Sequence, residues 1–165
     1  MKKLICSLLI IIALTNNSFS AGSSGDNDGG SAAKVSNYTK AKNLIKAAKK
    51  YEKKGKIEKA QTRYAKAQKL LIKSNEKKPL QADTLNYLGF TTRKLGDYEK
   101  GEEFYLQGLQ IEPNHNGINE YLGELYIVTN RMDLAKERLN VLKSCNCKEY
   151  NQLKEIIEGT KKSKY

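Results

Sequence analysis

A repeat of 34 residues is the feature that most constrains how this 165-residue chain can fold. Residues 86–89 (NYLG) recur as residues 120–123 (EYLG), and at the same offset of 34 Gly101 corresponds to Ala135. A period of this length typically encodes one supersecondary unit, and each unit leaves an apolar face that only a neighbouring copy can cover. The repeat therefore predicts a stack of similar units.

A longer copy of the same unit lies upstream. Residues 55–60 (GKIEKA), followed by Tyr64, parallel residues 96–101 (GDYEKG), followed by Tyr105, at an offset of 41. The seven additional residues amount to about two turns of helix at 3.6 residues per turn. An insertion of two turns preserves the helical phase, so a helix can lengthen without turning its buried face outward.

The repeated segments have the spacing and the boundaries of helices. Leu85, Leu88 and Leu95 recur at helical intervals. Gly55 and Gly96 suit helix C-caps, while Asp97 can cap the helix that follows. Pro79 and Pro113 favour helix ends before the next pair begins. These signals predict helical hairpins.

The period and the residues within it resemble the tetratricopeptide repeat family. That family's pattern is a bulky residue, Leu-Gly, an aromatic residue, a small residue, an aromatic residue and proline. The second repeat supplies much of this pattern, with Leu85, Leu88, Gly89, Gly101, Tyr105 and Pro113. It departs from the pattern at Thr92, which replaces the first aromatic residue, and the third repeat has Cys147 where proline is usual.

The resemblance implies an all-α fold, a right-handed α-solenoid of about three helical hairpins. We expect repeats at about 41–81, 82–115 and 116–149, within a domain of residues 38–160. A C-terminal capping helix at about 148–159 should cover the last apolar face. Its apolar positions fall on one stripe: Tyr150, Leu153, Ile156 and Ile157.

The resemblance also implies a non-catalytic scaffold for protein–protein interaction, because such stacks bind a peptide or a partner helix in their concave groove. The predicted groove residues are Lys49, Asn86, Phe90, Arg93, Glu120 and Glu124. We expect Phe90 to be an exposed aromatic anchor, with Asn86 and Arg93 holding a peptide backbone or carboxylate. The alternative is that a neighbouring helix covers Phe90. The sequence contains no Ser-His-Asp set, phosphate-binding glycine loop or paired acid and base, so no enzyme is expected.

The first twenty residues have the layout of a secretory signal peptide. Lys2 and Lys3 precede an apolar run at residues 4–14, and a polar, small-residue segment follows. We expect cleavage before Ala21, which would place the protein in the bacterial periplasm or outside the cell. An uncleaved anchor or a buried first helix is the alternative. The apolar run is too short to span a bilayer as a stable helix, and no second apolar stretch follows.

Composition defines two further terminal segments. Residues 21–37 are rich in Gly, Ser and Asp and lack apolar periodicity, which predicts a flexible linker. Residues 161–165 (KKSKY) form a basic tail.

Positive charge is concentrated in the first repeat of a chain whose net charge is +12. Residues 40–80 contain 15 Lys or Arg residues and three Glu residues, whereas residues 81–160 contain nine Lys or Arg residues and 13 Asp or Glu residues. One interpretation of this segregation is contact with an anionic membrane, an acidic protein or an envelope polymer. The alternative is a solvated lysine-rich face. Nucleic acid is not expected, because the lysines are diffuse and lack the Arg-and-aromatic clusters that stack on bases.

Cys145 and Cys147 are the most chemically suggestive pair. In an oxidising compartment they can form a local disulfide. Alternatively, their thiolates could bind Cu or Zn with His115 as a third ligand, or they could act as a redox pair. No other cofactor is expected.

Overall fold

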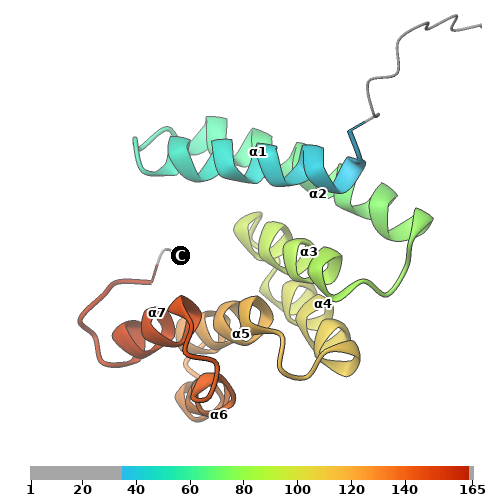
Figure 1. Cartoon of the computed structure of the whole chain (residues 1–165). Coiled ribbons are helices and arrows are strands. Elements are labelled where there is room, and N and C mark those ends of the chain that lie inside the picture. Colours follow the sequence, from blue (N-terminus) through green and yellow to red (C-terminus); the bar gives the residue numbers. More distant parts are fainter. Residues whose placement is uncertain (1–34, 164–165) are drawn as a thin grey trace, which may run out of the picture. The chain divides into compact units, whose positions relative to one another are not determined.

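The computed structural model describes residues 35–163, which form seven helices and contain no strand (Figure 1). The predicted signal peptide, its cleavage before Ala21 and most of the predicted linker lie outside the described residues. The last two residues of the basic tail, 164–165, also lie outside them.

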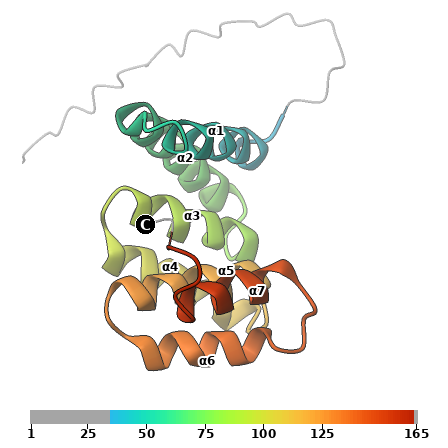
Figure 2. The same ribbon diagram turned by 90° about the vertical axis from the view of Figure 1, so that its left-hand side faces the viewer.

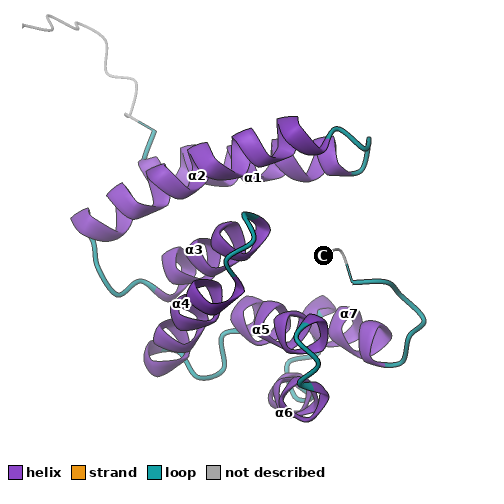
Figure 3. Ribbon diagram, turned by 180° about the vertical axis from the view of Figure 1, so that it is seen from behind, coloured by secondary structure: helices purple, strands orange, loops and turns teal. Residues whose placement is uncertain are grey.

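The helices pair in chain order into three hairpins, followed by one further helix (Figure 3). The bounds are α1 (Asn37–Glu52), α2 (Ile57–Lys77), α3 (Ala82–Lys94), α4 (Tyr98–Ile111), α5 (Asn116–Val128), α6 (Met132–Leu142) and α7 (Lys148–Ile157). Hairpin α1–α2 packs on α3, α4 packs on α5, and α7 packs on α5 and α6. The prediction of an all-α solenoid of helical hairpins is confirmed.

Local capping explains where the helices begin and end. The side chains of Ser36, Asp97 and His115 each accept a hydrogen bond from the backbone N–H three residues later, at the starts of α1, α4 and α5. Gly55 and Gly96 adopt positive φ angles of 67° and 99° in the turns after α1 and α3. Glycine adopts this region without the steric cost that a Cβ atom imposes. The capping roles expected of Gly55, Gly96 and Asp97 are confirmed.

Glycines allow the helices to approach closely. A Cβ atom on Gly89 of α3 would lie 2.5 Å from a ring carbon of Tyr105 on α4. A Cβ atom on Gly123 of α5 would lie 2.5 Å from a methyl carbon of Leu153 on α7. Leu153 and Ile156 are buried, so α7 covers the apolar face of α5 as a capping helix does.

The residues that follow α7 form hydrogen bonds and an ion pair with that helix. The backbone N–H groups of Thr160 and Lys161 donate to the carbonyl oxygen of Glu155, and the Lys161 ammonium lies 2.9 Å from its carboxylate.

Figure 2 shows the first helices of the hairpins following one another as α1, α3 and α5, with α7 beside α5. Among residues 35–163, no helix combines the length and apolarity needed to cross a membrane.

Candidate functional site

The six residues predicted to line a groove belong to the first helices of the hairpins, but they are largely buried. Lys49 lies on α1, while Asn86, Phe90 and Arg93 lie on α3, and Glu120 and Glu124 lie on α5. Phe90 is only 1% exposed and Arg93 only 2%, and the two glutamates and Asn86 are also buried. Lys49 is partly buried. The expectation that Phe90 is an exposed anchor is therefore wrong.

Two neighbouring helices and a lysine cover Phe90. Its ring centroid lies 5.7 Å from that of Tyr64 on α2 and 5.0 Å from that of Tyr121 on α5. The Lys49 ammonium lies 4.3 Å from the Phe90 centroid and donates a hydrogen bond of 3.0 Å to the Tyr121 hydroxyl. Aromatic pairs and cation–π contacts of this kind add to the free energy of area burial. Phe90 thus joins all three hairpins and stabilises the stack.

Arg93 forms a buried ion pair with Glu124. Its Nη2 atom lies 3.2 Å from the Glu124 carboxylate, and the two side chains are 0% and 2% exposed. Its Nη1 atom donates a hydrogen bond of 2.6 Å to the backbone carbonyl of Tyr121. A buried charge is tolerated only when it is paired and hydrogen-bonded. The guanidinium predicted to hold a peptide instead fastens α3 to α5.

A second polar cluster fastens the first hairpin to α3. The Lys94 ammonium lies 2.7 Å from one Glu52 carboxylate oxygen, and the Tyr64 hydroxyl donates a hydrogen bond of 2.8 Å to the other. Burial lowers the pKa of Lys94, an effect that the nearby Glu52 carboxylate opposes. Burial and the same carboxylate raise the pKa of Tyr64. These contacts link α1, α2 and α3.

An open hollow remains between α1 and α3, which we call the α1–α3 hollow. Its volume is about 380 Å³, and its lining residues are Lys42, Asn43, Ile45, Lys46, Lys49 and Tyr87. Lys42, Asn43 and Lys46 are exposed, and Tyr87 is half-buried. The Lys42 ammonium lies 5.1 Å from the ring centroid of Tyr38 and 6.0 Å from that of Tyr87.

The chemistry of the α1–α3 hollow suits a peptide that carries carboxylates. Ammonium groups pair with carboxylates, an amide side chain can hydrogen-bond a peptide backbone, and an aromatic ring offers an apolar contact surface. Lys42, Asn43, Lys46 and Tyr87 were absent from the predicted groove. The sequence signal that could have identified Lys42 and Lys46 is their i, i+4 spacing, which places them on one face of α1. Ala41, Ile45 and Ala48 form the buried face of this helix.

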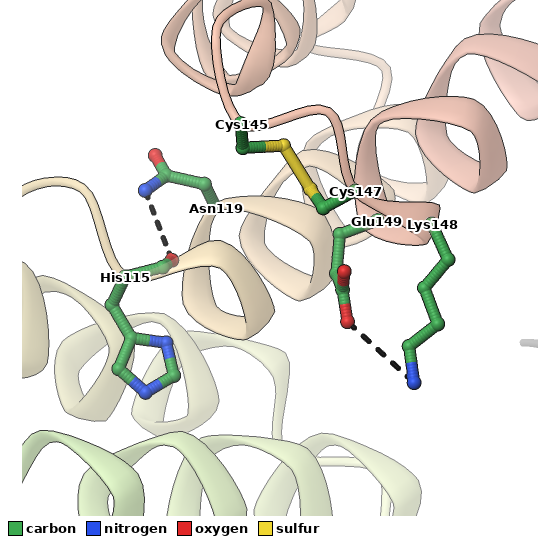
Figure 4. Close-up of a disulfide and its surroundings, with 6 residues drawn as sticks. All are labelled: His115, Asn119, Cys145, Cys147, Lys148 and Glu149. Carbon is green, nitrogen blue, oxygen red and sulfur yellow. Dashed lines mark hydrogen bonds and ion pairs between the residues drawn. A yellow bond between two sulfur atoms is a disulfide. The ribbon is translucent and has the colours of Figure 1, made fainter.

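Cys145 and Cys147 form a disulfide, one of the alternatives open from the sequence, with Cα atoms 5.2 Å apart. Figure 4 shows the His115 imidazole pointing away from the disulfide. Its Nδ1 atom accepts a hydrogen bond from the Ile118 N–H, and its Nε2 atom lies 3.3 Å from the Asp83 carboxylate. Within the part of the chain that the structure describes, no three His, Cys, Asp or Glu side chains gather as metal ligands. Cu or Zn binding through both thiolates would require the reduced protein, and it stays a prediction.

Comparisons with known proteins returned a structural likeness alone. No family model matches the sequence, and no curated protein matches it. Among solved structures, the chain is similar to the first tetratricopeptide repeat of Spaghetti (RPAP3) bound to the HSP90 peptide SRMEEVD. The TM-score is 0.47 at 19% sequence identity, and the match covers 74% of this chain and 94% of the other.

Proposed function

We propose that this protein is a non-catalytic interaction scaffold of the bacterial envelope, which binds an acidic peptide or helix of a partner protein in the α1–α3 hollow. One observation carries the proposal: Lys42 and Lys46 are exposed beside Tyr87 and Asn43. Within residues 35–163, neither lysine has a carboxylate at ion-pair distance. A carboxylate of a partner would supply the missing counter-charge.

The buried clusters that join α1, α2, α3 and α5 support this function by holding these helices in place. The Glu52–Lys94 pair joins α1 to α3, and the Phe90 ring packs between α2 and α5. Binding to a surface whose helices are already held in place avoids part of the entropic cost of ordering. Phe90 and Arg93 of the predicted groove are thus proposed to position these helices, whereas Lys49 lines the hollow itself.

The proposed location rests on residues 1–20 and their signal-peptide layout. Sequencing the N-terminus of protein recovered from the periplasm or medium of an expressing bacterium tests it. We expect the mature chain to begin at Ala21. Recovery of a cytoplasmic chain beginning at Met1 would contradict export.

The binding proposal is tested by exchanging charge in the hollow. We expect Lys42→Glu/Lys46→Glu to lose a partner captured from envelope extract by the unmodified chain. The matched control is Lys136→Glu/Lys143→Glu, which makes the same change in net charge at exposed positions on and after α6. Both variants should keep the helical circular dichroism signal. Capture that the two variants retain equally would refute the assignment of the hollow.

A further inference from the structure

A second hollow lies between α1 and α2, near the turn that joins them. We call it the α1–α2 hollow. Its volume is about 370 Å³, and its lining residues are Ala47, Lys50, Tyr51, Lys54, Lys56 and Arg63. Four of these six residues are cationic, and none is acidic. The α1–α2 hollow shares no lining residue with the α1–α3 hollow.

Tyr51 positions the guanidinium of Arg63. The central carbon of that group lies 4.3 Å from the Tyr51 ring centroid, and Nη2 lies 3.5 Å from the Tyr51 hydroxyl. A guanidinium stacked on an aromatic ring is restrained in orientation, while its remaining N–H groups can still donate. The planar fork of donors matches the spacing of phosphate oxygens.

The positive charges of the hollow are not paired with a carboxylate in the described part of the chain. Across residues 35–163, no carboxylate lies within 4 Å of the charged groups of Lys50, Lys54, Lys56 or Arg63. The nearest acidic residues along the sequence do not supply one. Glu52 is engaged by Lys94 and Tyr64, and Glu58 does not line the hollow.

The start of α2 adds a partial positive charge, which the Glu58 carboxylate in the first turn offsets in part. Lys56 is the N-cap of this helix and provides no side-chain acceptor for the first-turn N–H groups. A helix N-terminus carries partial positive charge, which favours a nearby anion. Four like charges around one concavity repel each other, and a multiply charged anion removes that repulsion.

We propose that the α1–α2 hollow binds the phosphate group of a multiply charged anion, with Arg63 as the bidentate donor and Lys50, Lys54 and Lys56 as the surrounding charges. This ligand and this site differ from those of the proposed function. The same chemistry is offered by a free polyphosphate and by the headgroup of an anionic lipid. Ile57 is 54% exposed beside the hollow and would contact the lipid in the second case.

Titration calorimetry of the full chain with inorganic pyrophosphate at low salt tests the site. We expect Lys54→Gln/Arg63→Gln to weaken binding about tenfold or more, because two charge-assisted contacts are lost. The matched control, Lys66→Gln/Lys69→Gln, removes the same charge from exposed positions of α2 outside the hollow and should bind within about twofold of the unmodified chain. Arg63→Lys keeps the charge but removes the fork, and should also weaken binding.

Helical circular dichroism of each variant verifies that the fold is retained. An amide NMR titration of the unmodified chain gives a readout that does not depend on any variant. Pyrophosphate should shift Lys54, Lys56 and Arg63 selectively. Equal weakening in the site and control variants, or shifts spread over every lysine of the hairpin, would overturn the proposal in favour of diffuse charge.

Vesicle sedimentation distinguishes the two sources of phosphate. A lipid ligand requires binding to phosphatidylglycerol vesicles over phosphatidylcholine vesicles, lost in the site variant, kept in the control and weakened by Ile57→Ser. Pyrophosphate binding without that preference identifies a free anion. Residues 1–20 are present in every variant, so any vesicle binding by this segment is the same in all of them and does not affect the comparison. A glutamate-rich peptide that binds the hollow where pyrophosphate does not would refute the phosphate assignment.

Discussion

Replacing Arg93 by methionine should destabilise the fold strongly, although the side chain keeps much of its length and apolar area. In the native protein the Arg93 and Glu124 side chains are 0% and 2% exposed and lie 3.2 Å apart. The substitution leaves the Glu124 carboxylate buried without that partner. It also removes the hydrogen bond of 2.6 Å to the carbonyl of Tyr121.

The expected loss is about 4 kcal/mol, since breaking a buried ion pair by removing one member costs about 3–5 kcal/mol. That is a large part of the roughly 5–15 kcal/mol by which a domain is ordinarily stable. With a urea dependence of about 2 kcal/mol per molar, the unfolding midpoint should fall by about 2 M. Arg93→Met/Glu124→Leu should recover most of this loss, because an apolar pair replaces both charges.

Urea unfolding followed by circular dichroism measures these midpoints. Lys136→Met is the matched control, since its ion pair with Asp133 joins side chains that are 61% and 98% exposed. An exposed pair of this kind contributes little, so its midpoint should stay within error of the unmodified protein. Equal midpoints for Arg93→Met and Lys136→Met would refute the reasoning that burial gives the Arg93 pair its importance.

Three further predictions concern packing, pH and the disulfide. Gly89→Ala should destabilise the protein by about 1 kcal/mol net, because overpacking against the buried Tyr105 ring costs about 1–3 kcal/mol and the gain in helix propensity returns about 1 kcal/mol. Urea unfolding measures this, and a variant more stable than the unmodified chain would contradict it. Burial raises the pKa of Tyr64 and Tyr105 above that of an unfolded tyrosine, about 10, so the unfolded chain loses protons first and stability should fall as pH rises past 10. Tyrosinate absorbance at 295 nm should then rise together with loss of helix, and complete ionisation with the helices intact would disprove it. Reducing the Cys145–Cys147 disulfide opens a ring of three residues, which should lower stability by about 1–2 kcal/mol on the loop-entropy model and the melting temperature by roughly 5 °C. Unfolding of the whole domain on reduction would show that the pair has a larger role.

Much of the fold could be predicted because its signals are local. Gly55 and Gly96 end helices through their own backbone conformation, and Asp97 caps α4 through an atom three residues away. The 34-residue period repeats these signals, so the hairpins follow one another along the chain. Gly89 and Gly123 lie at close helix contacts, and a missing side chain of this kind is visible in the sequence itself.

The candidate site depended on contacts between residues that are distant in the chain. Helical spacing could not show that Tyr64 and Tyr121, from two other helices, cover the ring of Phe90. Arg93 and Glu124 were each identified as groove residues, and their mutual ion pair was not. The sequence therefore identified the two residues, and only the packing of the hairpins showed that they form an ion pair.

By itself the sequence determined that this chain forms helices, where they end and how they repeat, because capping, glycine conformation and apolar spacing act within a few residues. Only the tertiary structure decided which polar groups are buried and which are exposed. Stacking placed Phe90 and Arg93 between hairpins and left Lys42 and Lys46 on the surface. The physical reason is that burial depends on the neighbour that covers a side chain, and in a solenoid that neighbour comes from another repeat.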